Sequence, residues 1–367
     1  MKFSIEREDY LKPLQDVLGA VERKQTMPIL GNVLIEATDS SLILTASDSE
    51  IELQSSIQLP EGSQPGAVTV PARKMHDICR SLPDHARIDC ELSGEQLKVK
   101  SGRSRFTLST LPAAEFPKSE PLENAQTVIL QQSDLLQTIR STAFSMAQQD
   151  VRFYLNGMLM EIGQERLCCV ATDGHRLAYS ESTTEASPDE PIRAIVPRKS
   201  VNELTKLLGS SLGEVTLSLS ENYLKIIIQD VILTTKLIDG RFPDYNRVIP
   251  IDVDKELLLD RDSLRDTLQR AAILSSEKYR GVRLAVESGV LTVSSNNPER
   301  EEAIDELEVD YAGQSAEIGF NVTYLLDVLA AMEGENARIL LKDSNSSALV
   351  MPEANDSTKY VIMPMRL

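Results

Sequence analysis

The stretch Leu42–Asp48, which reads LILTASD, returns further along the chain as Leu167–Asp173, which reads LCCVATD. The spacing is about 125 residues, and a fainter third copy, Leu291–Asn296 (LTVSSN), follows at a similar interval. Self-similarity at a fixed spacing indicates repeated structural units, so the sequence predicts three similar domains. Three like neighbours related by one repeated rotation form an arc, and an arc can close on a second copy into a ring.

Each copy has the same order of expected elements. A short alternating strand precedes a first helix, several strands follow, and a second helix leads into closing strands. The apolar residues of the first helices are Tyr10, Leu11, Leu14, Val17 and Leu18, then Leu135, Leu136 and Ile139 after a possible Ser133 cap, and finally Leu264 and Leu268. The second helices follow Val70–Pro71, Val196–Pro197 and Phe320–Asn321. The proline of the first two pairs suits a helix start. This pattern predicts an α+β fold with two helices packed on β-sheets in each domain.

The expected domains are 1–121, 126–250 and 253–367, because polar or proline-containing stretches lie near Pro117–Asn124 and Pro250–Asp254. A chain of 367 residues is long enough for several cores. We find no signal peptide, membrane span or lipidation motif, so we expect a cytoplasmic protein without membrane contact.

The cysteines and histidines show no pattern of a metal or redox site. Cys168 and Cys169 lie in an apolar strand pattern, so we interpret them as small core residues rather than redox or metal ligands. The three histidines, His76, His85 and His175, are far apart in sequence. We therefore predict no metal and no cofactor.

The net charge of −18 indicates an acidic protein that repels nucleic acid, but the basic residues are not spread evenly. Many lie in or beside the expected helices, namely Lys24, Arg73, Lys74, Arg80, Arg140, Arg198, Lys199, Lys206 and Arg270. If the helices face one way, these groups form one basic face that contacts phosphates without reading bases. The alternative is that they only solvate exposed helix faces.

Catalytic motifs are absent from the sequence. The chain has no P-loop, dinucleotide-binding fingerprint, zinc-protease motif or nucleophile elbow. Asp173 and His175 are the best acid/base candidates, but Asp-Gly is also a common turn. Asp239–Tyr245 is interpreted as a second loop that could line a pocket. The alternatives to a ring with a phosphate-contacting face are therefore a hydrolase or transferase using Asp173 and His175, and a repeat scaffold that does not bind DNA.

Four separated motifs resemble the bacterial DNA polymerase III beta subunit family, the sliding clamps, in the right order along the whole chain. They are Thr172–Ala178 (TDGHRLA), Asp239–Tyr245 (DGRFPDY), Gly319–Val322 (GFNV) and Tyr360–Leu367 (YVIMPMRL). Arg103–Phe106 and Ala271–Ser275 also match.

The resemblance implies a head-to-tail homodimer whose six domains form a ring around duplex DNA, with helices lining the hole. Such a ring slides without sequence specificity and tethers the polymerase III catalytic subunit, so it is a processivity factor and not an enzyme. It also implies that the clamp loader, other polymerases and repair proteins bind through short linear peptides. The implied DNA contacts are Lys24, Arg73, Gln149, Phe153 and Tyr154, and the basic helices add Arg198 and Lys199. Lys24 stands where some members have Arg, which removes a planar fork, and Phe153 stands where Tyr is frequent.

Two further sites follow from the resemblance. The dimer interface joins basic Arg103 and Arg105, with Phe106 and Leu108, to Ile273 and Leu274 and the acidic Glu299, Glu301, Glu302 and Asp305. The alternative for Ile273 and Leu274 is a place in the core of a helix. The partner-peptide pocket comprises Leu155, Thr172, Gly174, His175, Arg176, Leu177, Pro243, Arg247, Val248, Asn321, Tyr324, Ser347, Val361, Met363, Pro364, Met365 and Arg366. The alternative for Met363 and Met365 is a frayed tail.

Overall fold

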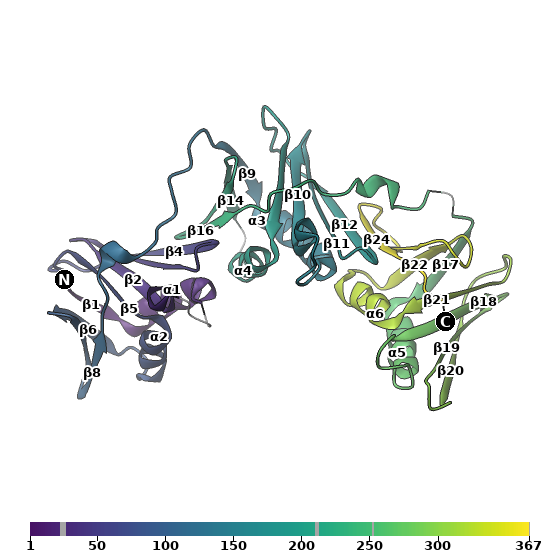
Figure 1. Ribbon diagram of the computed structural model, residues 1–367, viewed down its shortest axis with the longest axis horizontal. Coiled ribbons are helices and arrows are strands. Elements are labelled where there is room, and N and C mark those ends of the chain that lie inside the picture. Colours follow the sequence, from purple (N-terminus) through teal and green to yellow (C-terminus); the bar gives the residue numbers. More distant parts are fainter. Residues whose placement is uncertain (23–26, 210–212, 252, 367) are drawn as a thin grey trace. The chain divides into compact units, whose positions relative to one another are not determined.

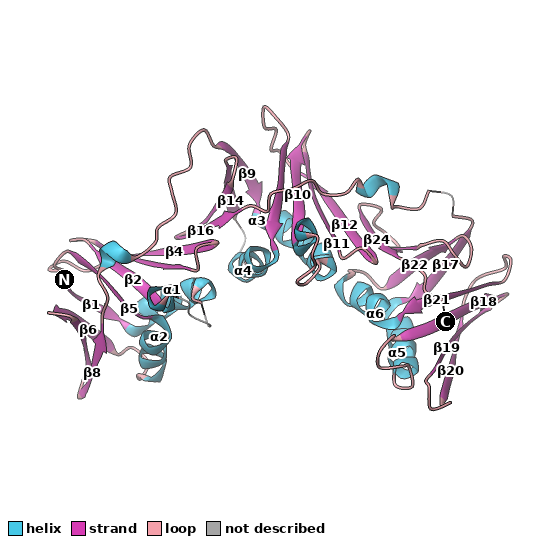
Figure 2. Ribbon diagram, viewed as in Figure 1, coloured by secondary structure: helices cyan, strands magenta, loops and turns pink. Residues whose placement is uncertain are grey.

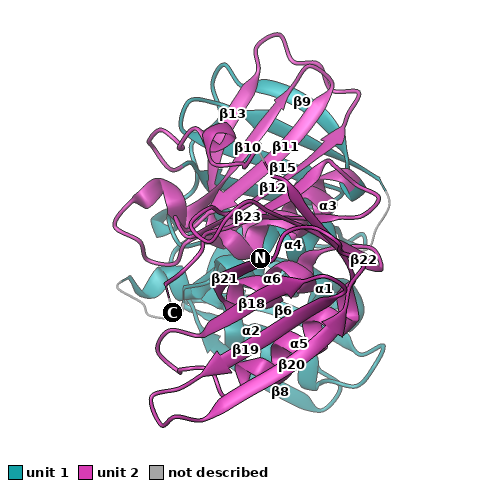
Figure 3. Cartoon of the chain, turned by 90° about the vertical axis from the view of Figure 1, so that its right-hand side faces the viewer, with its two compact units in different colours: residues 1–133, 202–237 teal, residues 134–201, 238–367 magenta. Residues whose placement is uncertain are grey.

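The computed structural model describes residues 1–22, 27–209, 213–251 and 253–366 (Figure 1). Lys24, a predicted DNA contact, lies outside these residues. The chain divides into two compact units, Met1–Ser133 with Asn202–Leu237 and Asp134–Val201 with Ile238–Leu367 (Figure 3). Each unit is described by itself.

The first unit contains two antiparallel sheets. The four-stranded sheet has the order β1 (Lys2–Glu6), β6 (Arg87–Ser93), β7 (Gln96–Ser101) and β8 (Ser104–Ser109). The eight-stranded sheet has the order β5 (Gly66–Pro71), β2 (Asn32–Ala37), β3 (Ser41–Ser47), β4 (Ile51–Gln58), β16 (Val231–Lys236), β15 (Tyr223–Ile228), β14 (Glu214–Leu219) and β9 (Gln126–Gln131). Strands far apart in sequence, β4 and β16, therefore pair in its middle, with Leu53 opposite Leu233.

The helices α1 (Arg7–Val17) and α2 (Ala72–Ser81) of this unit lie side by side against its strands (Figure 2). Helix α1 buries Tyr10, Leu14 and Val17, the residues that the helical spacing selects. Helix α2 begins directly after Pro71, as predicted from proline's lack of an N–H.

The second unit repeats this arrangement. Its eight-stranded sheet has the order β13 (Ile192–Pro197), β10 (Gly157–Gly163), β11 (Arg166–Thr172), β12 (Arg176–Thr183), β24 (Thr358–Ile362), β23 (Ala348–Pro352), β22 (Asn336–Leu341) and β17 (Lys255–Asp260). Its four-stranded sheet has the order β20 (Glu302–Glu308), β19 (Val290–Asn296), β18 (Gly281–Glu287) and β21 (Ala316–Asn321). The stretches that decided the sequence interpretation form β3, β11 and β19, each paired antiparallel with the strand before it, which confirms the repeat.

The remaining α-helices are α3 (Gln132–Thr142), α4 (Arg198–Leu208), α5 (Arg261–Ala272) and α6 (Val322–Ala331). Helix α3 begins at Gln132, so Ser133 lies inside its first turn and not before it. The prediction that Ser133 is the N-cap residue is therefore wrong. Asp260 caps α5 by accepting from Ser263 N at 2.7 Å, and Asn321 caps α6 by accepting from Thr323 N at 2.9 Å. Short 3₁₀ helices are Leu18–Ala20, Pro28–Gly31, Ala113–Glu115, Ala143–Ser145, Phe153–Asn156 and Tyr245–Arg247.

The cysteines belong to the core, as predicted. All four are free and buried. Burial raises the pKa of the Cys168 and Cys169 thiols to about 12, so both stay protonated and unreactive at neutral pH. No helix within the described residues is both long and apolar enough to cross a membrane.

Candidate functional site

The turn between β11 and β12 is built by short side chains that bond to their own backbone. Thr172 Oγ1 donates to Arg176 O at 2.6 Å and accepts from Gly174 N at 3.1 Å. Asp173 Oδ1 accepts from the backbone N–H groups of His175 and Arg176 at 2.9 and 3.0 Å. Gly174 has a φ of +89°, a conformation that a Cβ would strain. The sequence Thr-Asp-Gly-His-Arg is therefore a turn that presents His175 to solvent.

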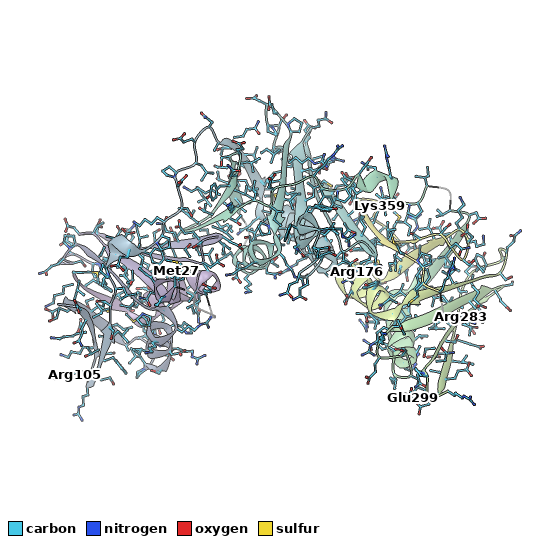
Figure 4. All side chains as sticks on the ribbon, in the orientation of Figure 1. Met27, Arg105, Arg176, Arg283, Glu299 and Lys359 are labelled. Atoms are coloured by element: carbon cyan, nitrogen blue, oxygen red, sulfur yellow. The ribbon has the colours of Figure 1, made fainter. Side chains whose placement is uncertain are left out.

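Arg176 joins this turn to a helix more than a hundred residues away in sequence (Figure 4). Its Nε donates to Asp173 Oδ2 at 3.1 Å, and its Nη1 donates to Asp327 Oδ2 on α6 at 2.5 Å. Its Nη2 donates to Phe144 O at 3.0 Å. The guanidinium also lies 4.6 Å from the ring centroid of Tyr324 and 5.3 Å from that of Phe144. A planar cation with five donors can satisfy all these groups at once.

The carboxyl-terminal strand closes the same site. In β24, Val361 lies opposite Leu177 of β12. Beyond the strand, Met363 N donates to His175 O at 2.9 Å and Met365 N donates to Gly319 O at 2.8 Å. The alternative of a frayed tail is therefore wrong, because backbone bonds hold the tail over the turn and over β21 while the Met363 side chain stays exposed.

An apolar floor underlies these segments. Leu177 and Val361 are buried in one apolar cluster, against which the half-buried Val248 packs, and Leu155 is also buried. Phe242 and Tyr245 are buried anchors of the segment that also carries the exposed Pro243.

A hydroxyl–carboxylate bond fixes that segment to the sheet. Tyr245 Oη donates to Glu161 Oε2 at 2.7 Å, and its ring lies 5.8 Å from that of Tyr179. Tyr179 Oη in turn donates to Glu181 at 2.5 Å. Burial, with the carboxylate that each phenol bonds, raises the pKa of both tyrosines above the ordinary value, so both remain donors.

The structure brings most predicted pocket residues together on β12, β24, α6 and the adjoining turns. His175, Arg176 and Tyr324 also line a cavity of about 300 Å³ that includes Arg198, a predicted DNA contact. Arg198 Nη1 donates to Met146 O at 2.6 Å, which ties its guanidinium to the segment before the exposed loop 148–153. The sequence placed Arg198 and His175 in separate sites.

Other predicted pocket residues have different surroundings. Arg247 is exposed and pairs with Asp244 at 3.0 Å. Ser347 is half-buried directly before β23, and Asn321 uses its side chain to cap α6. Sequence reasoning missed Asp327 and Phe144, which hold Arg176, because nothing in their local patterns indicates a distant arginine.

Two predicted DNA contacts of the second unit, Gln149 and Phe153, lie on or at the end of a braced, exposed loop. Phe153 is 74% exposed, and Gln149 is exposed with a φ of +58°. The neighbouring Val151, which sequence reasoning missed, is 87% exposed. Arg152 Nε and Nη2 donate to the two oxygens of Asp150 at 3.0 and 2.9 Å. These bonds lower the pKa of Asp150 to about 2. Tyr154 is half-buried, as is Lys199 on α4, whereas Arg73 on α2 is exposed.

The predicted dimer residues lie on or beside two edge strands and directly after α5. Strand β8, with Arg105 (Figure 4) and Phe106, pairs only with β7 in the described residues, and β20 pairs only with β19. Ile273, at the end of α5, is 77% exposed, so a place in the helix core is excluded. Ile304, which sequence reasoning missed, is 60% exposed between acidic neighbours on β20.

Some predicted interface residues also have contacts within their own unit. Leu108 is 7% exposed, so most of its side chain packs inside that unit. Asp305 accepts from Arg270 Nε at 2.6 Å within the same unit, which also engages one of the basic helix residues. One oxygen of the Glu301 carboxylate accepts from Asn297 Nδ2 at 2.7 Å within the β19–β20 connection. Arg103, Glu299 and Glu302 are exposed.

One carboxylate–histidine cluster is visible only in three dimensions. Ligand atoms of Glu6, Glu8 and His85 lie within 4.8 Å of one another. Glu8 is already engaged, since it accepts from Arg7 at 2.8 Å and from His85 N at 3.2 Å. Local spacing could not indicate this group because strand β1 and helix α1 meet His85 through the fold.

The acid/base alternative for Asp173 and His175 is not supported by the geometry. Asp173 uses Oδ1 on two backbone N–H groups and Oδ2 on Arg176, so its carboxylate holds the turn rather than orienting the imidazole. A general base would need a free carboxylate or imidazole aimed at a reacting proton.

Comparisons with known proteins agree over the whole chain. Family models described as the N-terminal, central and C-terminal domains of the DNA polymerase III beta subunit match residues 1–120, 129–244 and 246–366. The chain is 51% identical to the beta sliding clamp of Pseudomonas putida and 49% identical to that of Escherichia coli, with 100% of each chain covered. A crystal structure of the Pseudomonas aeruginosa sliding clamp with ligand has a TM-score of 0.97 at 49% identity, and one bound to griselimycin has a TM-score of 0.97 at 50% identity, again with 100% of each chain covered. The chain therefore belongs to the DNA polymerase III beta subunit family, the sliding clamps, and has the three α+β domains of that family.

Proposed function

We propose that two copies of this chain close head to tail into a ring of six domains around duplex DNA and tether a polymerase to its template. The domains are those of residues 1–121, 126–250 and 253–367. The observation that carries the proposal is the pair of open edge strands with opposite charge. Strand β8 brings Arg105, and β20 brings Glu302 and Glu306. An open edge offers unpaired backbone groups, so one copy's β8 can pair with the other's β20.

The apolar centre of this junction comes from residues that are exposed in one chain. Phe106 is half-buried on β8, and Ile273 and Ile304 are largely exposed beside the acidic strand. Burying exposed aliphatic side chains supplies the favourable free energy, and the opposite charges set register and orientation. Leu274 is half-buried and adds to the same side.

The experiment on closure is a double substitution, Ile273→Ala with Leu274→Ala. We expect small-angle scattering of the unchanged protein at micromolar concentration to give about 81 kDa, twice the chain mass of 40.6 kDa, with a hollow centre. The double variant gives the single-chain mass. The matched control is Ile129→Ala with Leu258→Ala, which removes exposed aliphatic residues on other strands and leaves the dimer intact. A double variant that stays dimeric in sedimentation at low micromolar concentration contradicts the assignment.

The ring holds DNA through phosphates and not through bases. Arg73, Gln149 and Phe153 are exposed, and Lys24, Tyr154, Arg198 and Lys199 complete the proposed set. Contacts to phosphate vary little along a duplex, so the ring slides, while a net charge of −18 disfavours attachment of DNA to its other faces. Because bacterial replication takes place in the cytoplasm, that is the proposed location.

Sliding has a topological test. Clamp that a loader has placed on a nicked circular plasmid should stay bound through gel filtration and should be lost when the plasmid is cut once. Equal retention on circular and linear DNA would mean ordinary binding rather than encirclement. The test also separates the clamp from a repeat scaffold, which would bind neither form.

The site around Arg176 is proposed to accept short peptides of the polymerase III catalytic subunit, the clamp loader, other polymerases and repair proteins. Leu155, Leu177 and Val361 form an apolar floor, and Met363 adds an adaptable exposed side chain. A concave apolar floor with a few polar groups is the usual form of such a site. The chain has no catalytic part in this function, which depends only on binding.

Deleting residues 363–367 tests the pocket. The deletion removes Met363 and Met365, whose amides bond to His175 O and Gly319 O, so peptide binding should be lost. These residues are distant in sequence from β8 and β20, so sedimentation should still show the dimer. Unchanged affinity for a fluorescent peptide of the polymerase III catalytic subunit would refute the pocket.

A further inference from the structure

Met363, directly after β24, is one of two exposed methionines in the chain. The chain has ten methionines, all of them within the described residues, and only Met27 at 49% and Met363 at 41% are exposed. The others are buried or half-buried. Met27 (Figure 4) belongs to the first unit and Met363 to the second, so Met27 is a control for Met363 within the same molecule.

The backbone fixes the face on which the Met363 side chain lies. Val361 lies opposite Leu177 where β24 pairs with β12. The bond from Met363 N to His175 O at 2.9 Å extends this pairing beyond the last residue of the strand. Side chains two residues apart along an extended strand point to the same face. Met363 therefore lies on the face of Val361, which belongs with Leu177 to the apolar floor of the peptide site.

The thioether of Met363 is accessible to an oxidant, whereas the thiols of the chain are not. Peroxides oxidise thiolates and accessible thioethers. All four cysteines are buried, and burial raises the pKa of Cys168 and Cys169 to about 12, so these two offer no thiolate at neutral pH. The exposed methionines are therefore the sulfur-containing side chains that a peroxide meets first.

We propose that Met363 is an oxidation site that regulates the peptide site, because conversion of its thioether to the sulfoxide weakens peptide binding. The inference rests on the proposed peptide site and adds a regulation to it. Hydrogen peroxide transfers one oxygen atom to the sulfur, which loses two electrons, and the peroxide is reduced to water. Methionine sulfoxide reductases reverse the step, with a pair of thiols oxidised to a disulfide and the oxygen released as water.

The sulfoxide changes the surface that a peptide meets. Its oxygen is a polar acceptor, whereas the side chains of Leu177 and Val361 on the same face have no donor to offer it. An apolar peptide side chain that docks there removes the oxygen from water without giving it a partner, which disfavours the complex. One polar group left without a partner in this way should lower affinity about tenfold.

The measurement is fluorescence anisotropy with a labelled peptide of the polymerase III catalytic subunit. The full-length protein is measured before and after limited treatment with hydrogen peroxide, which catalase then removes. Mass spectrometry of proteolytic fragments gives the fraction of sulfoxide at each methionine. Affinity should fall about tenfold as Met363 is converted, and the two reductases, one for each sulfoxide epimer, should restore it. Sedimentation should give the same mass before and after treatment.

Two substitutions at Met363 assign the effect to its sulfur. Met363→Leu keeps an apolar side chain of similar volume without a thioether, so its affinity, whatever its starting value, should not change on oxidation. Met363→Gln places a polar acceptor at the same position and should bind about tenfold more weakly than Met363→Leu with no oxidant present. The matched control is Met27→Leu, which should lose affinity on oxidation as the unchanged protein does.

A bound peptide should also shield the sulfur. With saturating peptide, Met363 should be oxidised several-fold more slowly than in the free protein. The oxidation rate of Met27 in the same sample should stay unchanged, which shows that the peptide has not consumed the oxidant.

The outcomes separate this proposal from the peptide site itself. Equal affinity after complete conversion of Met363 overturns the proposal, as does a loss of affinity that persists in Met363→Leu. Equal binding by Met363→Gln and Met363→Leu, or oxidation that the peptide does not slow, overturns it as well. In all these cases the unoxidised protein still binds the peptide, so the peptide site stands. Failure of the unoxidised protein to bind refutes the peptide site and with it the regulation.

Discussion

Arg176→Lys should weaken the peptide site while leaving the chain folded. Lysine keeps the positive charge but offers one ammonium in place of a planar fork. It can hold Asp173 or Asp327, but it cannot hold both carboxylates and also donate to Phe144 O, as the guanidinium does. Stacking on the Tyr324 ring, 4.6 Å from the guanidinium carbon, is lost as well.

The magnitude follows from the groups that lose their partner. A hydrogen bond to a charged group contributes about 1.5–3 kcal/mol, a neutral one about 1 kcal/mol, and stacking of a cation on a ring about 0.5–1 kcal/mol. The Asp327 side chain is 38% exposed, so solvent screens part of this loss. We expect a net cost of about 2 kcal/mol to the arrangement of the turn on α6, which lowers peptide affinity by up to about 30-fold.

The assay is fluorescence anisotropy with a labelled peptide from the polymerase III catalytic subunit, with sedimentation to show that the dimer is kept. The matched control is Arg283→Lys, because Arg283 pairs with Glu317 at 3.1 Å on a more exposed surface where such pairs contribute little. Affinity within twofold of the unchanged protein for Arg176→Lys would refute the reasoning that the guanidinium holds the site together.

Three other changes have defined outcomes. Tyr245→Phe removes the bond to Glu161 and should cost about 1 kcal/mol, seen as a roughly fivefold loss of peptide affinity without a change in dimer mass; an unchanged affinity would mean that ring packing alone holds the segment. The thiol of Cys168, whose pKa is about 12, should not react with Ellman's reagent at pH 8 until the protein is denatured; rapid labelling of the native protein would contradict its burial. Arg152 lowers the pKa of Asp150 to about 2. The stabilisation of the loop by this Asp150–Arg152 contact is therefore complete above the ordinary carboxyl pKa near 4 and is lost as the pH falls toward 2. The protection of the backbone amides of loop 148–153 against hydrogen exchange should fall as the pH is lowered through that window. Asp150→Asn should remove this pH dependence.

The sequence predicted what depends on local periodicity. Tyr10, Leu14 and Leu268 lie at helical spacing and form buried helix faces, and the repeated stretches form equivalent strands. The pairing of β4 with β16 and of β12 with β24 could not be predicted, because edge strands of different repeats choose each other only in the folded chain.

The same limit applies to the sites. The turn at Thr172–Arg176 was predictable because its short polar side chains bond to neighbours in sequence. The partners of Arg176 on α6 and at Phe144 come from segments that are far apart in sequence. Exposure also depends on packing across the fold, so the low exposure of Leu108 and the high exposure of Ile304 could not be predicted from their strand patterns.

The position of β24 has a consequence for folding. It follows β12 by more than 170 residues in sequence, yet it lies between β12 and β23 in the interior of an eight-stranded sheet. Until β24 joins the sheet, β12 has a bare edge, which is a template for wrong pairing with other chains. The proposed peptide site, which needs Val361 against Leu177, is complete only after β24 has paired with β12. A molecule in which β24 is still unpaired should therefore be unable to bind at that site.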